Sequence, residues 1–239
     1  MSRVFDNNVS NYMSRSSVNF GLNGLTECSI GLWVKLTAST ADNQRFVDKK
    51  HSVSTSGCPF RLQYVDATGE VTASVNNGAG QSPDWACTWT PGYGVWGRML
   101  FTFKRNAITT ADGILYLNGI AQSTSTFTAN GYAAGFTIAE DSNDLFYGLR
   151  VVTNLLPLYG SLAWVCVWNR QLTAQEALID YTNPRNVKSG LLSIVELSPD
   201  TDQGAIGGSM TVNGTLQAGG NPPLKNGAHR SMFQSVNWE

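Results

Sequence analysis

The chain has 239 residues, a length that an all-β sandwich can occupy as one domain, and only 14% of its residues are charged. An average globular domain carries about 25% charged residues, so much of this polar surface must consist of hydroxyl and amide groups. With 16 basic and 17 acidic residues and no long basic run, the chain does not fit nucleic-acid binding. Such a surface suits carbohydrate or a neutral protein neighbour.

The sequence carries no targeting or membrane signal. Its first ten residues lack the positive start and apolar core of a secretory signal peptide. No stretch approaches 18 uninterrupted apolar residues, which a membrane-spanning helix would need. We therefore expect a protein that is made in the cytoplasm and has no membrane partner.

Short runs of alternating apolar and polar residues predict strands along most of the chain. In chain order, we expect strands at residues 29–36, 60–65, 70–75, 99–104, 114–117, 120–127, 162–168, 191–197 and 210–216. The turn at residues 66–69 and the dipeptide Asn118-Gly119 both predict hairpins. Residues 162–168 are apolar on both faces, which indicates a central strand covered on both sides.

One helix is expected, at residues 174–181. Thr173 and Glu176 have the spacing of a capping box, Leu172 and Ala177 can form the accompanying hydrophobic staple, and Pro184 stops the helix. Many short strands with one short helix predict an all-β sandwich of two antiparallel sheets.

The four cysteines are Cys28, Cys58, Cys87 and Cys166. They contain no Cys-x-x-Cys pair and are widely spaced, which argues against a structural zinc site. We expect four free thiols, with at least Cys166 in the core.

Several stretches match motifs of a known family. Residues 113–119, Gly-Ile-Leu-Tyr-Leu-Asn-Gly, match its "G-x-L-x-L-Y-V-N-G" strand and turn, and residues 159–176 match its "F-x-G-x-I-x-x-V-x-I-Y-N-R-A-L-T-x-x-E" block. Further matches are residues 3–13 with an "F-D-G-x-x-D-Y-V" strand, residues 29–34 with "S-I-S-x-W-V", and residues 96–103 with "W-H-H-V-A-x-x-Y". In these motifs the chain resembles the laminin-G-like branch of the concanavalin A-like lectin/glucanase superfamily. The resemblance implies a jelly-roll sandwich of two antiparallel sheets with one short helix.

The chain beyond residue 185 looks like the C-terminal extension of bacteriophage versions of this family. Residues 198–202 resemble an "S-P-E-x-D" segment, and residues 211–215 resemble a "T-V-x-G-T" strand that precedes a proline-containing tail. We expect a sandwich at residues 1–218 and a C-terminal arm at residues 219–239.

The resemblance implies a non-catalytic phage virion structural protein, such as a capsid decoration or accessory protein, that is made in the host cytoplasm. Its partners would be the major capsid protein or other virion proteins, and it would form a homo-oligomer on the particle. The alternative is a module of a tail fibre that binds a host glycan or receptor. A glycoside hydrolase is the third hypothesis.

Catalytic machinery is absent from the sequence. Glycosidases of this superfamily carry paired carboxylates on one strand, as in "E-x-D-x-x-E", and no predicted strand has that spacing. The two histidines, His51 and His229, lie far apart in polar segments, and there is no phosphate-binding glycine motif. We therefore expect no enzyme and no organic cofactor.

An acidic run at residues 140–144 carries five oxygen-bearing side chains, which are the ligands that calcium prefers. It makes Asp141 and Asp144 candidate calcium ligands, and Asp200 with Asp202 offers a second cluster. The alternative, which we prefer, is a solvated acidic loop, because Asp and Asn are common in turns.

The segment at residues 82–96 is rich in aromatic side chains among Pro and Gly. Trp85, Trp89 and Tyr93 are candidates for stacking on a sugar ring or for anchoring a protein interface. The alternative is that they cap the open end of the sandwich, and Trp96 is expected in the core.

The tail at residues 219–239 lacks periodicity. Four apolar residues, Met232, Phe233, Val236 and Trp238, suggest an arm that becomes ordered on a neighbouring subunit. Fraying of the terminus is the alternative.

Overall fold

The structure, a computed structural model, describes residues 2–16, 18–49, 59–140, 144–149, 156–197, 201–202 and 208–223. Its strands are β1 (Ser2–Asp6), β2 (Tyr12–Arg15), β3 (Glu27–Leu36), β4 (Gln44–Asp48), β5 (Phe60–Val65), β6 (Glu70–Val75), β7 (Asp84–Thr88), β8 (Gly97–Lys104), β9 (Gly113–Leu117), β10 (Ile120–Ala121), β11 (Thr126–Thr128), β12 (Leu145–Tyr147), β13 (Tyr159–Trp168), β14 (Leu191–Val195), β15 (Thr201–Asp202), β16 (Gly208–Ser209), β17 (Thr211–Asn213) and β18 (Gln217–Gly219). The helical elements are α1 (Ala174–Thr182) and the 3-10 turns η1 (Thr110–Asp112) and η2 (Pro184–Asn186).

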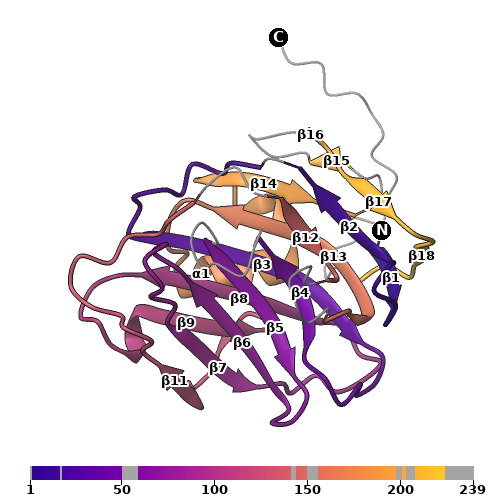
Figure 1. Cartoon of the computed structure of the whole chain (residues 1–239), viewed down its shortest axis with the longest axis horizontal. Coiled ribbons are helices and arrows are strands. Elements are labelled where there is room, and N and C mark those ends of the chain that lie inside the picture. The colour runs from indigo at the N-terminus through magenta and orange to yellow at the C-terminus, as the bar shows by residue number, and fades with distance from the viewer. Residues whose placement is uncertain are drawn as a thin grey trace.

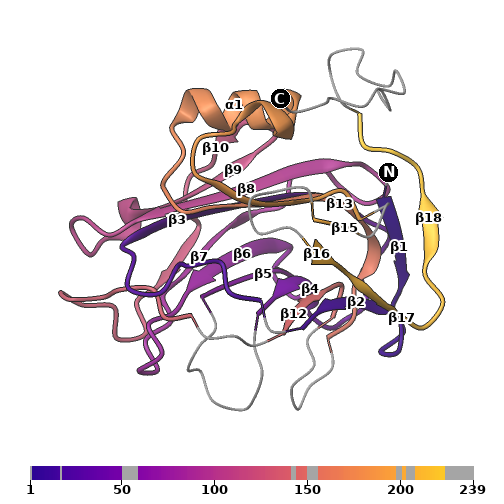
Figure 2. The same ribbon diagram turned by 90° about the horizontal axis from the view of Figure 1, so that it is seen from above.

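The strands form two antiparallel sheets that lie one on the other (Figures 1 and 2). The first sheet runs β10-β9-β8-β3-β13, and β1 and β14 share the remaining edge of the long strand β13. The second sheet runs β11-β7-β6-β5-β4-β12-β2-β17. The described part of the chain thus confirms the predicted all-β sandwich with one short helix.

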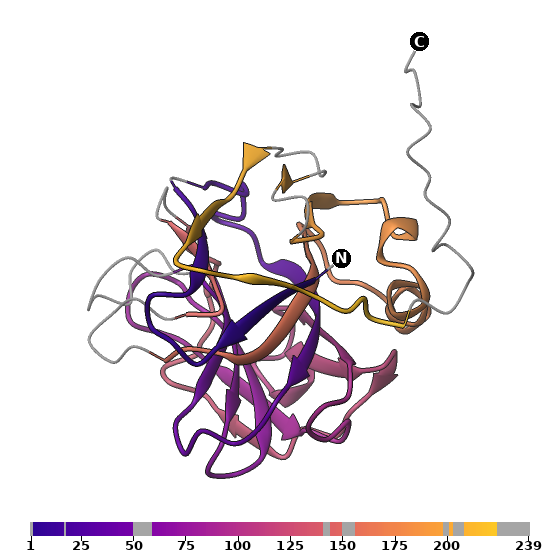
Figure 3. The same ribbon diagram turned by 90° about the vertical axis from the view of Figure 1, so that its right-hand side faces the viewer.

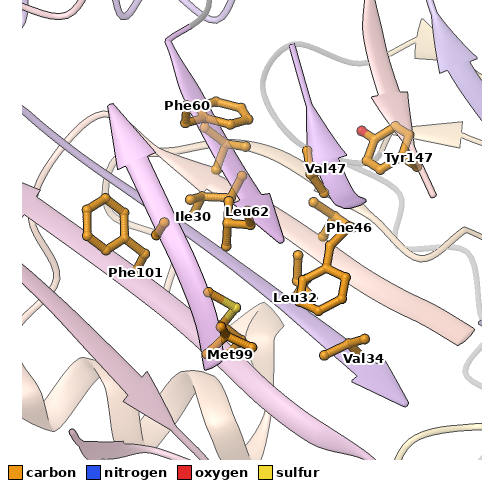
Figure 4. Close-up of a cluster of buried hydrophobic side chains, with 14 of the residues drawn as sticks. Ile30, Leu32, Val34, Phe46, Val47, Phe60, Leu62, Met99, Phe101 and Tyr147 are labelled. Carbon is orange, nitrogen blue, oxygen red and sulfur yellow. The ribbon is translucent and has the colours of Figure 1, made fainter. Parts of the chain in front are cut away.

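The core lies between the two sheets. Alternate residues of β3, among them Ile30 and Leu32, meet Phe46 and Leu62 of the second sheet, and all four side chains are fully buried (Figure 4). Burying each such side chain contributes about 1.5–3 kcal/mol. This interior needs no cross-link, in keeping with the free thiols of Cys28, Cys87 and Cys166; Cys58 lies outside the described residues.

Helix α1 covers a second apolar layer on the outer face of the first sheet (Figure 2). Trp33, Trp164 and Trp168 lie in this layer, so β13 is buried on both faces as its sequence predicts. The helix begins where expected, because the Thr173 and Glu176 side chains form the capping box. Trp96 packs against this outer layer, half-buried, and the expectation that it belongs to the interior core is wrong.

Two expected strands differ in the structure. The run at residues 120–127 becomes β10 in the first sheet and β11 in the second. Of the run at residues 210–216 only Thr211–Asn213 form a strand, β17, and a further strand, β18, follows at Gln217–Gly219. β17 pairs with β2 of the second sheet and β18 with β1 of the first, which Figure 3 shows as yellow strands beside indigo ones. The C-terminal segment therefore joins both layers, and the expected boundary between residues 218 and 219 falls inside β18. Residues 224–239, which include the apolar positions of the predicted arm, lie outside the described residues.

Candidate functional site

Trp85 is a core residue and not a surface aromatic. Its side chain is fully buried and contacts the rings of Phe101 and Phe103, and its Nε1 donates to the Thr110 carbonyl at 2.9 Å. A Cβ added at Gly113, the first residue of β9, would lie 2.5 Å from the indole ring of Trp85. The indole therefore packs directly against the backbone of β9. The prediction that Trp85 stacks on a sugar or anchors an interface is therefore wrong.

Trp89 is also withdrawn from the surface. It is 8% exposed, its ring fills the space beside Gly97, and its Nε1 donates to the Gly92 carbonyl at 3.3 Å. So little of the indole is exposed that it cannot stack on a ligand. The position of Trp89 fits the alternative expectation, in which these aromatic residues cap the open end of the sandwich. Tyr93, in contrast, is 46% exposed and stays a candidate.

Of the acidic run at residues 140–144, the structure describes only the two ends, Glu140 and Asp144. Glu140 is buried, where it accepts hydrogen bonds from the backbone N–H of Phe20 and of Leu22, each at 2.8 Å, and pairs with Lys49 Nζ at 3.1 Å. Asp141 lies outside the described residues, and Asp144 directly precedes β12. Among the described residues no three His, Cys, Asp or Glu side chains are grouped as metal ligands, so the calcium site stays a prediction. Of the second acidic cluster, Asp200 also lies outside the described residues.

The outer face of the second sheet carries a polar surface that sequence reasoning missed. The strand registers place one residue from each of its eight strands in a single row across the sheet. In sheet order the row is Thr211, Ser14, Phe146, Asp48, Arg61, Ser74, Asp84 and Thr128. The next row inward along the strands is Arg45, Gln63, Thr72, Ala86 and Thr126. We call these two rows the polar face.

The registers also fix which way the polar face points. The residues that alternate with it, such as Leu62, Ala73 and Trp85, form an equally continuous row that packs into the core. Because side chains alternate along a strand, the polar face points away from the first sheet. Here the period-2 alternation puts hydrogen-bonding groups on one side of the whole sheet.

The accessible part of the polar face centres on Arg61 and Asp84, which form an ion pair across Ser74. Their side chains keep 30% and 23% of their surface exposed. Asn130, exposed beside them, donates from Nδ2 to Asp84 at 3.2 Å and to the Ser82 carbonyl at 2.8 Å. Towards β4 the face closes, because Arg45 and Asp48 are only 2% exposed. A guanidinium, a carboxylate and an amide therefore lie side by side, held by one another.

The carboxylates of the polar face are too far apart for glycoside hydrolysis. Asp48 and Asp84 are separated by three strand spacings of about 4.8 Å, or about 14 Å between their backbones. Paired catalytic carboxyl groups lie about 5–10 Å apart. This pair does not meet that geometry.

The buried thiols carry no reactive character. Burial raises the pKa of both Cys28 and Cys87 to about 12, with nearby Glu140 and Glu70 adding to the respective shifts. A thiol with so high a pKa is neither a nucleophile nor a metal ligand at neutral pH. These cysteines serve as small core residues.

Comparison with known families gives a match over most of this architecture. A family model described as the concanavalin A-like lectin/glucanases superfamily matches residues 6–177, from the end of β1 into α1. The chain belongs to the concanavalin A-like lectin/glucanases superfamily. Its two antiparallel sheets are therefore the jelly roll that the motif resemblance implied. A search of curated proteins returned no match.

Solved structures of distant sequence share this superfamily fold. A candidate carbohydrate-binding protein from Bacteroides ovatus aligns with a TM-score of 0.64 and 14% identity over 90% of this chain, which spans 59% of that protein's length. A heptameric pentraxin from Limulus polyphemus aligns with a TM-score of 0.59 and 13% identity over 90% of this chain and 93% of its own. The binding domain of botulinum neurotoxin serotype G aligns with a TM-score of 0.54 and 13% identity over 75% of this chain and 41% of its own. At these identities the likeness establishes the fold alone.

The described residues of this superfamily member include no helix with the length and apolar character needed to cross a membrane.

Proposed function

We propose that this chain is a non-catalytic, lectin-like module that binds carbohydrate on the polar face of its second sheet. The observation that carries the proposal is the group of Arg61, Asp84 and Asn130 at the accessible end of that face. Together these side chains offer planar donors and acceptors next to one another. Adjacent hydroxyl groups of a sugar ring are both donors and acceptors, so they suit such a group.

The charge pattern favours sugars over phosphates. Arg61 is neutralised by Asp84, so this end of the face offers hydrogen bonds without an excess of positive charge. Across the whole chain the formal net charge is −1. Phosphate-rich ligands are attracted by an excess of positive charge, which this protein does not have.

The absence of catalysis in this proposal follows from geometry. The backbones of Asp48 and Asp84, the two acidic residues of the polar face, are about 14 Å apart, and the Asp84 carboxylate is bound to Arg61 and Asn130. We therefore propose that the protein binds carbohydrate without hydrolysing it.

The direct test is an immobilised glycan array probed with the whole chain and with Arg61→Met and Asp84→Ala. We expect a positive glycan whose binding weakens about tenfold or more in both variants, because hydrogen bonds to charged groups are the strong ones. Lys104→Met is the matched control, since Lys104 is an exposed cation of the first sheet paired with Glu27. An array with no signal, or equal losses in the control, would overturn the proposal.

We further propose that this module is a structural decoration or accessory protein on the virion of a bacteriophage. The motifs at residues 198–202 and 211–215 support it, together with C-terminal strands that join both sheets into one rigid unit. Partners would be capsid or other virion proteins, and free sheet edges favour a homo-oligomer on the particle. Electron cryo-microscopy of purified particles tests it: density for this sandwich on the capsid is expected, and its absence from every part of the particle contradicts it.

A further inference from the structure

Tyr93 is an aromatic side chain that the fold holds rigidly at the surface. The residue is 46% exposed, and its ring meets that of Tyr64 edge-on, with ring centroids 6.3 Å apart. The two phenol oxygens lie 3.0 Å apart and share a hydrogen bond. The hydrogen bond to Tyr64 thus holds the hydroxyl end of Tyr93, while the residue remains partly exposed to solvent.

The loop around Tyr93 is built to keep this position. Gly92 and Gly94 flank it with φ angles of +77° and +75°, a conformation that glycine adopts without strain. The Gly94 N–H donates to the Leu36 carbonyl at 2.7 Å, and Trp89 holds the Gly92 carbonyl. A Cβ placed on either glycine would meet no atom within 4 Å, so the space on both sides of the tip is open.

Asp66 and Thr40 place polar groups on the side of the Tyr93 hydroxyl. Asp66 Oδ1 lies 3.4 Å from the Tyr93 hydroxyl, a long hydrogen bond. Its Oδ2 accepts from the Thr40 N–H at 2.6 Å and the Thr40 hydroxyl at 3.2 Å. Burial alone would raise the pKa of Asp66, but hydrogen bonds from Thr40, Ser39 and Gln44 outweigh it and lower the pKa, so the group is ionised at neutral pH. Thr40 and Ser39 lie in the loop that connects β3 to β4, and Gln44 is the first residue of β4.

We infer that the rim formed by Tyr93, Asp66 and Thr40 is a second carbohydrate subsite, one that takes a single pyranose ring. The apolar face of the sugar would stack on the Tyr93 ring, and its hydroxyl groups would reach Asp66 and Thr40. A flat aromatic surface next to a carboxylate and a hydroxyl matches the two kinds of surface that a pyranose presents. An ionised carboxylate on the rim favours neutral sugars over acidic ones.

This subsite rests on the proposed function but lies apart from the polar face. Asp66 follows Arg61 by five residues along β5 and its turn, a separation of about 17 Å at 3.4 Å per residue. One methyl glycoside is too small to reach both places. The two sites can therefore be tested independently in the same protein.

The experiment is saturation-transfer-difference NMR on the whole chain with the methyl glycosides of glucose, galactose, mannose and N-acetylglucosamine. We expect transfer to the ring protons of at least one glycoside. In Tyr93→Ala the affinity of the rim site should fall about three- to tenfold, the range expected for loss of an aromatic contact. Tyr93→Phe keeps the ring but loses the hydroxyl that bonds Tyr64 and Asp66, so its affinity should fall less than that of Tyr93→Ala.

Two controls make the outcome decisive. Val95→Ser changes a neighbouring exposed residue, 52% exposed, and should leave binding unchanged, and thermal melting should be the same for all variants. Signals that respond to Arg61→Met but not to Tyr93→Ala would overturn the rim subsite while the polar face stands. A lack of transfer for every glycoside, combined with self-association that Tyr93→Ala abolishes, would overturn it in favour of a protein interface.

Discussion

Asp112 is a buried carboxylate that holds a turn together. It accepts hydrogen bonds from the backbone N–H groups of Asn106, Ala107 and Ile108, at 2.9–3.1 Å, and from the Tyr132 hydroxyl. Burial alone would raise the pKa of Asp112, but these hydrogen bonds outweigh it and lower the pKa below its usual value. Glu140 and Asp180 are likewise buried and accept hydrogen bonds, so acidic residues that look like surface charges in the sequence are structural acceptors.

We predict that Asp112→Asn lowers the free energy of unfolding by about 1–3 kcal/mol at pH 7, because one acceptor oxygen becomes an amide donor. A carboxylate whose pKa is lowered by folding stabilises the fold above its unfolded pKa of about 3.9. That stability is lost as the pH falls through the folded pKa. The difference between wild type and variant in urea unfolding should therefore shrink below about pH 4. Asp42→Asn, at an exposed position, is the control; a difference that is constant with pH would contradict the account.

Helix α1 is attached to the first sheet by a buried ion pair. Arg98 Nε and Nη2 donate to the two Asp180 carboxylate oxygens at 2.7 and 2.6 Å, and Arg98 Nη1 donates to the Trp164 carbonyl at 2.6 Å. Trp164 has a φ of +52° at the bulge of β13, which turns its carbonyl towards the arginine. The bulge and the helix are therefore fixed by the same side chain.

Removing one partner of this pair should be more harmful than removing both. We predict that Asp180→Ala costs about 3–5 kcal/mol, since it leaves Arg98 buried without its counter-charge, and that Arg98→Met with Asp180→Leu recovers most of the loss. Chemical denaturation measures both. A double variant that is less stable than Asp180→Ala would show that the pair itself, and not the uncompensated charge, provides the stability.

Elements with local signals could be predicted, and those with distant partners could not. The capping box at Thr173 and the alternation in β3 depend on residues a few positions apart, so the sequence shows them directly. The division of residues 120–127 between two sheets depends on Tyr116 and Ala86, which lie in separate strands. The burial of Trp85 likewise depends on a strand of the opposite sheet, whereas its own neighbours, with Pro and Gly, look like a surface loop.

At the scale of the whole molecule, the two sheets have different outer faces. The outer face of the first sheet is covered by α1 (Figure 2) and carries an apolar layer, whereas that of the second sheet carries the polar face. The sequence could not show this contrast, because a row across eight strands is defined by register and not by spacing along the chain. Of the three aromatic candidates, Tyr93 alone stays accessible. Trp85 lies on β7 and points into the core, and Trp89 packs beside Gly97, whereas Tyr93 lies on a turn flanked by two glycines.

The most direct test of carbohydrate binding by the polar face is an amide NMR titration of the isotope-labelled chain with a glycan positive on the array. The account predicts saturable shifts concentrated at residues 61, 72, 74, 84, 128 and 130, on β5, β6, β7, β11 and the segment after β11. Shifts confined to the first sheet and α1, or no saturable shifts at all, would contradict it.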